Sequence, residues 1–374
     1  MKVLIVTTPV KPIGQGEGGG VDVSLHHIIR ALTHRQHQVS VIAPKGSQLD
    51  ADVDAKLIPI DGELQQSCQV HAPNTRFFCD DDCVLSRMWS AALAHQDDVD
   101  CILNLAYDWL PIWLTPFLPT PVFHLISMAN ENQQVANALQ RLNHTAPERI
   151  AFRTHAAANT FSFSHPVTTL ANGYPLAQFP FSPDGDGSIA WVGRISPEKG
   201  LEDAIRIAVR ADMPLKIWGF EQDSDYRQAL TREFPPSILQ WQGFVPHQTL
   251  LQQLQHCSAL LMTPKWVEAF GNCVAEAICC GVPVVAYNAG GPAEIVENGT
   301  TGFLIRPGDL DQAAAALSHV CQMNRTEVRR QGHQRFSLEA YAERLEIWMG
   351  LQRTTHSRHS TSKRQDPPRP LALG

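Results

Sequence analysis

Long apolar runs are absent from this sequence: 44% of its 374 residues are hydrophobic, yet no stretch is long enough to cross a bilayer. The chain starts Met1-Lys2 and enters a strand-like run at Val3 without an apolar leader. An excess of basic residues is also absent, because the formal net charge is -7, so nothing favours nucleic-acid binding. The length allows two domains that each bury a core. We expect a soluble, cytoplasmic protein.

Neither a disulfide framework nor a metal site is indicated. The nine cysteines are odd in number and include the adjacent pair at 279–280, which suits a reducing compartment. Cys79 and Cys83 flank the acidic run 80–82, but no second pair of ligands lies near them in the sequence. We therefore expect a solvated loop there and no bound metal.

Both halves of the chain alternate strand-like and helix-like segments. In the first half the pattern predicts strands at 2–7, 39–43, 101–105 and 121–126, and helices at 22–35 and 132–153. In the second half it predicts strands at 189–192, 215–218, 259–262 and 282–286, and helices at 201–210 and 274–280. We therefore predict an α/β fold of two Rossmann-like, doubly wound domains that face each other across a cleft.

The predicted domain boundary falls in the Pro- and Gly-rich stretch 179–187. We assign 1–180 to an N-terminal acceptor-binding domain and 181–337 to a C-terminal donor-binding domain. Segment 338–351 predicts an amphipathic helix. The tail 352–374 carries five Lys or Arg against one acid, and we expect it to be disordered.

A glycine-rich loop follows the first predicted strand. Gly14, Gly16 and Gly19 match the G-x-G-x-x-G spacing of dinucleotide-binding folds, but the residues from Pro9 to Ile13 lie between them and the first strand. The acid that should follow the second strand is also missing, so a nicotinamide cofactor is not favoured. Glycines that lead into a helix N-terminus can still hold a phosphate, here through Gly19 and Gly20. A plain surface loop is the alternative.

Two segments of the second half carry residues suited to a sugar nucleotide. Arg194 and Lys199 lie five residues apart on a strand-to-helix turn, where two cations can hold a diphosphate and stabilise it as it departs. Glu268 and Glu276 flank a glycine and a helix start, at a spacing that allows one carboxylate to bind a sugar and the other a ribose. A helix N-terminal acid and a surface glutamate are the alternatives for these two residues. Between the two glutamates, at the predicted helix N-terminus, we expect backbone amides to face a phosphate. These amides belong to Phe270, Gly271 and Asn272.

At these residues the chain resembles the retaining glycosyltransferases of family 4, which have the GT-B fold. The resemblance covers about residues 1–350. It rests on the Gly-Arg-x4-Lys-Gly turn at 193–200 and the E-x7-E element at 268–276, supported by the strand and loop 281–296 and by Asn172-Gly173. The resemblance implies that the helix 338–351 crosses back onto the N-terminal domain.

The family implies roles for these positions. Arg194 and Lys199 would bind the donor diphosphate, while Glu268 would engage the donor sugar and Glu276 the ribose. The segment from Gly243 to Val245 would run beside the nucleobase. Gly19 and Gly20 would contact the phosphate from the N-terminal domain. The family also implies a UDP-sugar as co-substrate, with no metal and no other cofactor.

One departure from the family concerns the acceptor side. Many relatives have a histidine at the end of the strand 121–126, where this chain has Ser127. A serine cannot act as a base unaided, so Asp108, His124, the donor phosphate or the acceptor itself must take the proton. His124 lies one alternation away, and a buried histidine is the favoured interpretation.

The acceptor is predicted less sharply. Residues 1–182 hold 11 Lys or Arg and 16 Asp or Glu, which favours a small soluble acceptor over a membrane lipid. The segments 7–21 and 123–128 resemble cyanobacterial UDP-glucose:tetrahydrobiopterin glucosyltransferases. That resemblance places a pteridine near Trp109, Trp113 and Phe123, although these aromatic residues could equally be core. A glycan or lipid acceptor and a catalytically silent nucleotide-sugar-binding protein are the alternatives. A nucleotide-sugar 2-epimerase is not favoured, because paired acid and base groups are not found.

Overall fold

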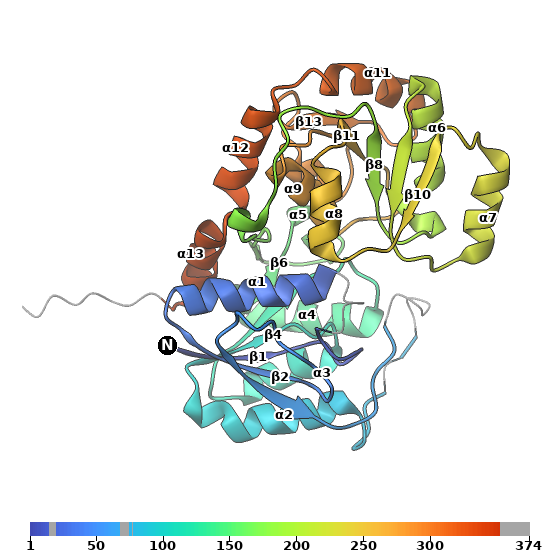
Figure 1. Cartoon of the computed structure of the whole chain (residues 1–374). Helices are drawn as coiled ribbons and strands as arrows, with labels where there is room; N and C mark the ends of the chain where they lie inside the picture. Colours follow the sequence, from blue (N-terminus) through green and yellow to red (C-terminus); the bar gives the residue numbers. More distant parts are fainter. Residues whose placement is uncertain (15–19, 68–74, 77, 352–374) are drawn as a thin grey trace, which may run out of the picture.

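The computed structural model describes residues 1–14, 20–67, 75–76 and 78–351. Within these ranges the chain forms two α/β domains, each built on a sheet of parallel strands (Figure 1). The chain passes from one domain to the other at two places, which we call the crossings. Gly16 and Gly19 of the predicted phosphate loop and the tail 352–374 lie outside the described residues. No described helix is long and apolar enough to cross a membrane.

The described part of the N-terminal domain has a seven-stranded sheet in the order β3-β2-β1-β4-β5-β6-β7. Its strands are β1 (Lys2–Val6), β2 (Gln38–Pro44), β3 (Ala55–Ile60), β4 (Cys101–Asn104), β5 (Val122–Ile126), β6 (Ile150–Phe152) and β7 (Thr168–Thr169). Its helices are α1 (Gly20–His34), α2 (Val84–His95), α3 (Trp109–Leu114), α4 (Gln133–Thr145) and α5 (His155–Ala158). Helices cover both faces, so β4 and β5 are buried throughout and are rich in apolar residues.

The described part of the C-terminal domain has a six-stranded sheet in the order β10-β9-β8-β11-β12-β13. Its strands are β8 (Ile189–Val192), β9 (Leu215–Trp218), β10 (Leu239–Gly243), β11 (Ala259–Met262), β12 (Val284–Tyr287) and β13 (Gly302–Ile305). Its helices are α6 (Leu201–Ala211), α7 (Ser224–Glu233), α8 (His247–Leu254), α9 (Asn272–Cys279), α10 (Pro292–Ile295), α11 (Leu310–Val320) and α12 (Arg325–Phe336). The predicted pair of doubly wound domains is confirmed.

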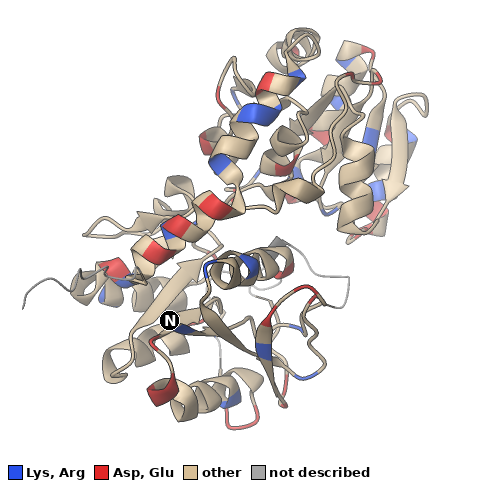
Figure 2. Ribbon diagram, turned by 60° about the vertical axis from the view of Figure 1, so that its left-hand side comes forward, with Lys and Arg blue, Asp and Glu red and all other residues tan. Residues whose placement is uncertain are grey.

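The last helix, α13 (Leu338–Met349), returns to the N-terminal domain and packs against α1. Glu346 on α13 pairs with Arg35 at 2.7 Å and with His37 at 2.8 Å, just beyond the end of α1. Figure 2 shows the accompanying change of charge: α12 carries arginines, whereas α13 is mainly acidic. The chain therefore crosses between the domains twice, near residues 170–180 and at the junction of α12 and α13.

The predicted helix 132–153 is wrong in its second part. Asn132 caps α4 by accepting hydrogen bonds from the amides of Gln134 and Val135, but the helix ends at Thr145. Pro147 follows, and its ring and missing N–H prevent the helix from continuing. The apolar residues from Ile150 to Phe152 then form the buried strand β6 beside β5. Strands β3, β6, β7, β10 and β13 were not predicted from the sequence.

Candidate active site

The candidate donor residues lie at the carboxyl ends of the strands, where open α/β sheets bind their ligands. The turn 193–200 follows β8, and the loop 263–271 follows the neighbouring strand β11. Gly200 closes the turn with a φ of 69°, and a β-carbon there would lie 1.8 Å from the carbonyl oxygen of Thr263. Only glycine allows this approach. The two segments are thereby held together.

The structure brings Lys199 and Glu268 into direct contact. The Lys199 ammonium lies 2.6 Å from Oε2 of Glu268, and both side chains are about one-sixth exposed, at 15% each. Arg194 lies on the same turn and donates to Gln222 at 2.7 Å, with Glu198 at 3.2 Å. Two cations and a carboxylate, partly shielded from water, therefore lie together at this edge of the sheet.

Sequence reasoning missed Trp266, which lies between these groups. Its ring centroid is 4.4 Å from the Lys199 nitrogen and 5.9 Å from the Arg194 guanidinium carbon. Its indole N–H also donates to Oε2 of Glu268 at 3.2 Å. The ring face attracts both cations and fixes their positions. Its nearness to Glu268 in the sequence was the available hint, but a single tryptophan gives no specific pattern.

Glu276 lies on α9, the helix that follows the loop 263–271, and its exposed fraction is 5%. Its carboxylate is 3.0 Å from Nε2 of His247, at the start of α8. Burial alone would lower the pKa of His247, but the charge and hydrogen bond of Glu276 outweigh burial and raise it above 6.5. The Glu276 side chain is therefore not the surface residue of the alternative interpretation, and it faces the loop that follows β10.

The segment between the two glutamates is not helical throughout. Gly271 has a φ of 96°, and α9 begins only at Asn272. The side-chain oxygen Oδ1 of Asn272 accepts from the Asn172 side-chain amide at 2.6 Å and from the Tyr174 hydroxyl at 2.9 Å, which ties the start of α9 to the first crossing. Phe270 is 5% exposed and packs against Phe336, so only its backbone can contact a donor.

Two other donor-side predictions have different outcomes. Val245 is partly buried against the core beside α8 and α9, close to the His247–Glu276 pair in sequence and space. Gly20 is the first residue of α1, as expected for a helix N-terminus, whereas Gly19 lies outside the described residues. Gly14 is held by a hydrogen bond from its amide to Asp22 at 3.0 Å.

The N-terminal domain contributes Arg153 and His27, neither of which was predicted. Arg153 follows β6, is 3% exposed, and donates to Ser127 at 3.2 Å and to the Tyr341 hydroxyl at 2.7 Å. The His27 ring lies 5.3 Å from the ring of Tyr174. Burial, reinforced by the charges of His247 and Arg30, lowers the pKa of His27 to about 3. Single residues of this kind offer no pattern that sequence reasoning could use.

His124 is not an acceptor-side residue. It is fully buried, and both ring nitrogens are engaged: Nδ1 lies 3.1 Å from the Asn104 amide and Nε2 lies 2.7 Å from the Thr115 hydroxyl. Thr115 donates its own proton to the Pro111 carbonyl, so we assign the imidazole as neutral with its proton on Nε2. Burial lowers its pKa to about 3, with a further contribution from Arg149. This histidine cannot reach an acceptor or take its proton.

Asp108 is also buried, at 2% exposure, and it caps α3 by accepting from the Leu110 amide. Burial raises its pKa to about 6. Its cap role gives this carboxylate a structural function close to the carboxyl end of β4. Ser127 follows β5, and its hydroxyl oxygen accepts a hydrogen bond from Arg153.

The three aromatic residues predicted to surround a pteridine do not meet. Phe123 points to the face of the sheet covered by α1 and α13, where its ring lies 5.2 Å from that of Trp348. Trp109 packs with α4, and Trp113 is half exposed beside Phe117. The predicted aromatic site is therefore wrong, because alternation along β5 sends Phe123 to the opposite face from His124 and α3.

The domains touch at the same edge. The Thr154 hydroxyl donates to the Ala269 carbonyl at 2.6 Å, immediately after Glu268. Glu294 on α10 accepts from the amides of His155 and Ala156 at 3.0 and 2.6 Å. We call these hydrogen bonds the interdomain contacts of α5. They hold the loop 263–271 and α10 against the N-terminal domain.

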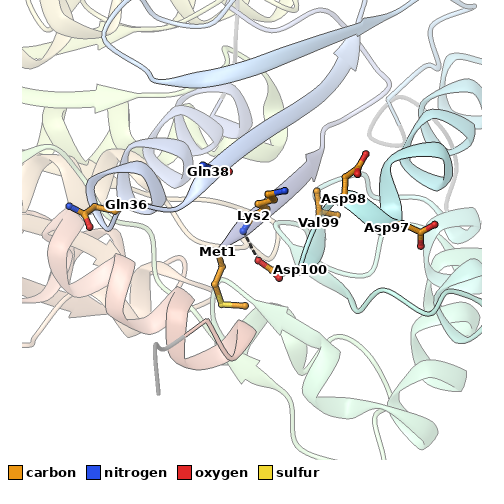
Figure 3. A pocket seen from close by; sticks show the side chains of 8 residues that line it. All are labelled: Met1, Lys2, Gln36, Gln38, Asp97, Asp98, Val99 and Asp100. Atoms are coloured by element: carbon orange, nitrogen blue, oxygen red, sulfur yellow. Dashed lines mark hydrogen bonds between the residues drawn. The ribbon is translucent and has the colours of Figure 1, made fainter. Parts of the chain in front are cut away.

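A separate hollow of about 480 Å³ lies at the opposite edge of the first sheet (Figure 3). Met1, Lys2 and Gln38 line it at the start of β1 and β2, together with Asp97, Asp98 and Asp100. Because this is the amino edge, the hollow is remote from the donor residues. Among the described residues no group of three His, Cys, Asp or Glu could hold a metal ion.

A comparison with known protein families matches the part of the chain that contains the candidate donor residues. Residues 177–335 match the family model "Glycosyl transferases group 1". The C-terminal domain is a group 1 glycosyltransferase domain. The turn 193–200, the loop 263–271 and α9 all lie inside the matched segment.

The similarity to curated proteins extends beyond this glycosyltransferase domain. The chain is 27% identical to a glycogen synthase from Mycobacterium tuberculosis over 372 residues, which covers 86% of each protein. A 2-deoxystreptamine N-acetyl-D-glucosaminyltransferase from Niallia circulans is 32% identical over 139 residues, or 35% of each chain.

Solved structures show the same GT-B fold over most of the chain. Sucrose-phosphate synthase from Thermosynechococcus elongatus superposes with a TM-score of 0.73 at 17% identity, covering 94% of this chain and 98% of that one. Anabaena Alr3699/HepE in complex with UDP and glucose superposes with a TM-score of 0.69 at 18% identity, covering 94% and 100%.

Proposed function

We propose that this protein is a retaining glycosyltransferase that moves a hexose, glucose in the first instance, from a UDP-sugar to a small soluble acceptor without a metal ion. The observation that carries the proposal is the Lys199–Glu268 pair beside Arg194, at the carboxyl edge of a group 1 glycosyltransferase domain. The complex of HepE with UDP and glucose supports UDP-glucose as the first donor to test.

In this proposal the cations act on the leaving group. The bond between the anomeric carbon and the β-phosphate oxygen breaks, and negative charge grows on the departing UDP. Arg194 and Lys199 stabilise that charge, which makes the transition state more favourable than the bound donor. Lys199 exchanges Glu268 for phosphate when the donor binds, and the released carboxylate accepts a sugar hydroxyl. Glu276 exchanges His247 for the ribose hydroxyls in the same way.

The acceptor proton goes to the leaving phosphate. His124 is closed off by Asn104 and Thr115, Asp108 caps a helix, and Ser127 is bonded to Arg153. None of these groups is a free base. A β-phosphate oxygen on the same face of the sugar accepts the proton while the acceptor oxygen bonds to the anomeric carbon, so configuration is retained.

Tetrahydrobiopterin is the first acceptor to test, although its predicted aromatic site is not formed. The net negative charge of residues 1–182 supports a soluble acceptor over a lipid surface. The similarity to a glycogen synthase favours a glycan as the second candidate.

The test is a reaction of the purified full-length chain with UDP-glucose and either tetrahydrobiopterin or a maltooligosaccharide, without added metal and with EDTA. Mass spectrometry would detect a product heavier by one hexose, and proton NMR would give the anomeric configuration. An α-linked product from this α-linked donor would support retention. A β-linked product would refute the retaining mechanism, and absence of UDP release with several nucleotide sugars would favour a silent binding protein.

A further inference from the structure

A second hollow, of about 330 Å³, lies between the domains at the two chain crossings, and three arginines line it. Arg153 and Arg344 line it from the N-terminal domain and α13, and Arg335 lines it from α12. Glu294 is the acid among the lining residues. Arg194, Lys199, Glu268 and Glu276 do not line it, although it borders the candidate active site through Phe270 and Arg153.

The charges of this hollow are only partly balanced. Arg335 pairs with Glu297 at 3.1 Å and donates to the carbonyls of Glu294 and Ile295. The Glu294 carboxylate is itself committed to the amides at the start of α5. Within the described part of the chain, Arg153 and Arg344 form no ion pair. Two guanidinium groups therefore face the hollow without a carboxylate of their own.

Of the three arginines that line the hollow, Arg344 has the fewest hydrogen bonds to described residues. Among the described residues its guanidinium donates one long hydrogen bond, 3.4 Å to the Ala171 carbonyl, and its Nε is buried without a partner. Its guanidinium lies 5.8 Å from the Tyr341 ring centroid. A buried donor that lacks a partner is costly, and a charged donor more so. An anion in the hollow would remove that cost.

We propose that this hollow binds a small phosphate-bearing anion, which bridges the two domains at their crossings. Guanidinium groups hold phosphate oxygens through paired N–H donors, and arginines on opposite sides of one hollow suit a doubly charged tetrahedral group. The anion contacts Arg344 and Arg153 on one side and Arg335 on the other. Because these residues belong to different domains, its binding stabilises the domain arrangement seen in the interdomain contacts of α5.

The test is calorimetric titration of the full-length Lys199→Ala protein with inorganic phosphate and, separately, with glycerol 3-phosphate. The Lys199→Ala background weakens phosphate binding at the donor site, and the Arg344 variants then show which part of the remaining heat comes from the hollow. Adding Arg344→Gln should weaken binding about tenfold or more, because a charged hydrogen-bond donor is lost. Arg330→Gln is the matched control, since Arg330 is an exposed α12 residue paired with Glu327. It should leave the affinity unchanged.

Three results would overturn the proposal. These are the absence of binding in the Lys199→Ala background, equal affinity with and without Arg344→Gln, and equal loss in the Arg330→Gln control. If Arg344→Gln does not fold, Arg344→Lys keeps the charge but removes the paired donors, and it should still bind more weakly than arginine. Binding of glycerol 3-phosphate alone would identify an organic phosphate as the ligand, whereas equal binding of both probes would identify the phosphate group.

Discussion

The two domains place different chemistry at the sheet edges that meet. The C-terminal edge carries three exchangeable ion pairs, Arg194–Glu198, Lys199–Glu268 and His247–Glu276. The N-terminal edge combines Arg153, which donates to Ser127 and Tyr341, with a closed, neutral network around His124. The family model matches residues 177–335, which include the charged edge but not the network around His124. The two edges therefore differ in charge and in burial, and the family model matches the charged one.

Breaking the charged edge should have the largest effect. Lys199→Ala should lower turnover of UDP-glucose by about a hundredfold or more, because one preorganised charge at the leaving group is removed. Glu268 keeps its hydrogen bond to Trp266, so the protein should stay folded. The measurement is the initial rate of UDP release, with circular dichroism to verify folding.

The control for this prediction is Lys265→Ala. Lys265 lies nearby on the same loop, but it pairs with Glu202 on α6, and the side chain is 41% exposed. Its removal should change the rate little. Normal turnover in Lys199→Ala, or an equal loss in Lys265→Ala, would contradict the assigned role of Lys199.

The next largest effect should come from Glu276. Glu276→Gln should weaken UDP binding about tenfold, because hydrogen bonds to a charged acceptor are worth more than those to a neutral one. Calorimetry of UDP binding measures this effect. His247→Gln is the matched variant: it removes the partner but keeps the carboxylate, so UDP affinity should not fall. If the two variants lose affinity equally, Glu276 acts through His247 and not through the ribose.

The same contrast explains how much the sequence could predict. The turn 193–200 was recognisable because its cations follow a strand directly, and both domains follow from alternating apolar segments. Trp266 and Arg153 were missed because their positions depend on contacts with segments distant in sequence, as with Arg153 and Tyr341. The pteridine site failed for a related reason: the resemblance grouped Phe123 with Trp109 and Trp113, whereas strand alternation places Phe123 on the opposite face of the sheet from α3.

The neutral network predicts a moderate effect of acid on stability. His124 has a pKa near 3 in the folded chain and an ordinary value of 6.5 when unfolded, so the unfolded state binds the extra proton. Its contribution is present above pH 6.5 and is lost as the pH falls, by about 2 kcal/mol near pH 5. Urea denaturation at several pH values measures the slope.

His124→Gln should reduce this acid-side slope, although the variant itself will be less stable at neutral pH. His256→Gln, at an exposed position on the other domain, is the control and should keep the slope of the unmodified protein. An unchanged slope in His124→Gln would mean that the network around Asn104 does not hold the imidazole neutral.

The smallest effect should come from His247, and it should have the opposite sign. Its pKa is raised by Glu276, so its stabilising contribution is complete below pH 6.5 and is lost as the pH rises through the raised value. The side chain is 34% exposed, so we expect less than about 1 kcal/mol. Denaturation at increasing pH should show this loss in the unmodified chain and not in Glu276→Gln. Opposite pH responses would confirm that one edge holds a neutral histidine and the other a charged pair, whereas the same sign at both edges would remove that distinction.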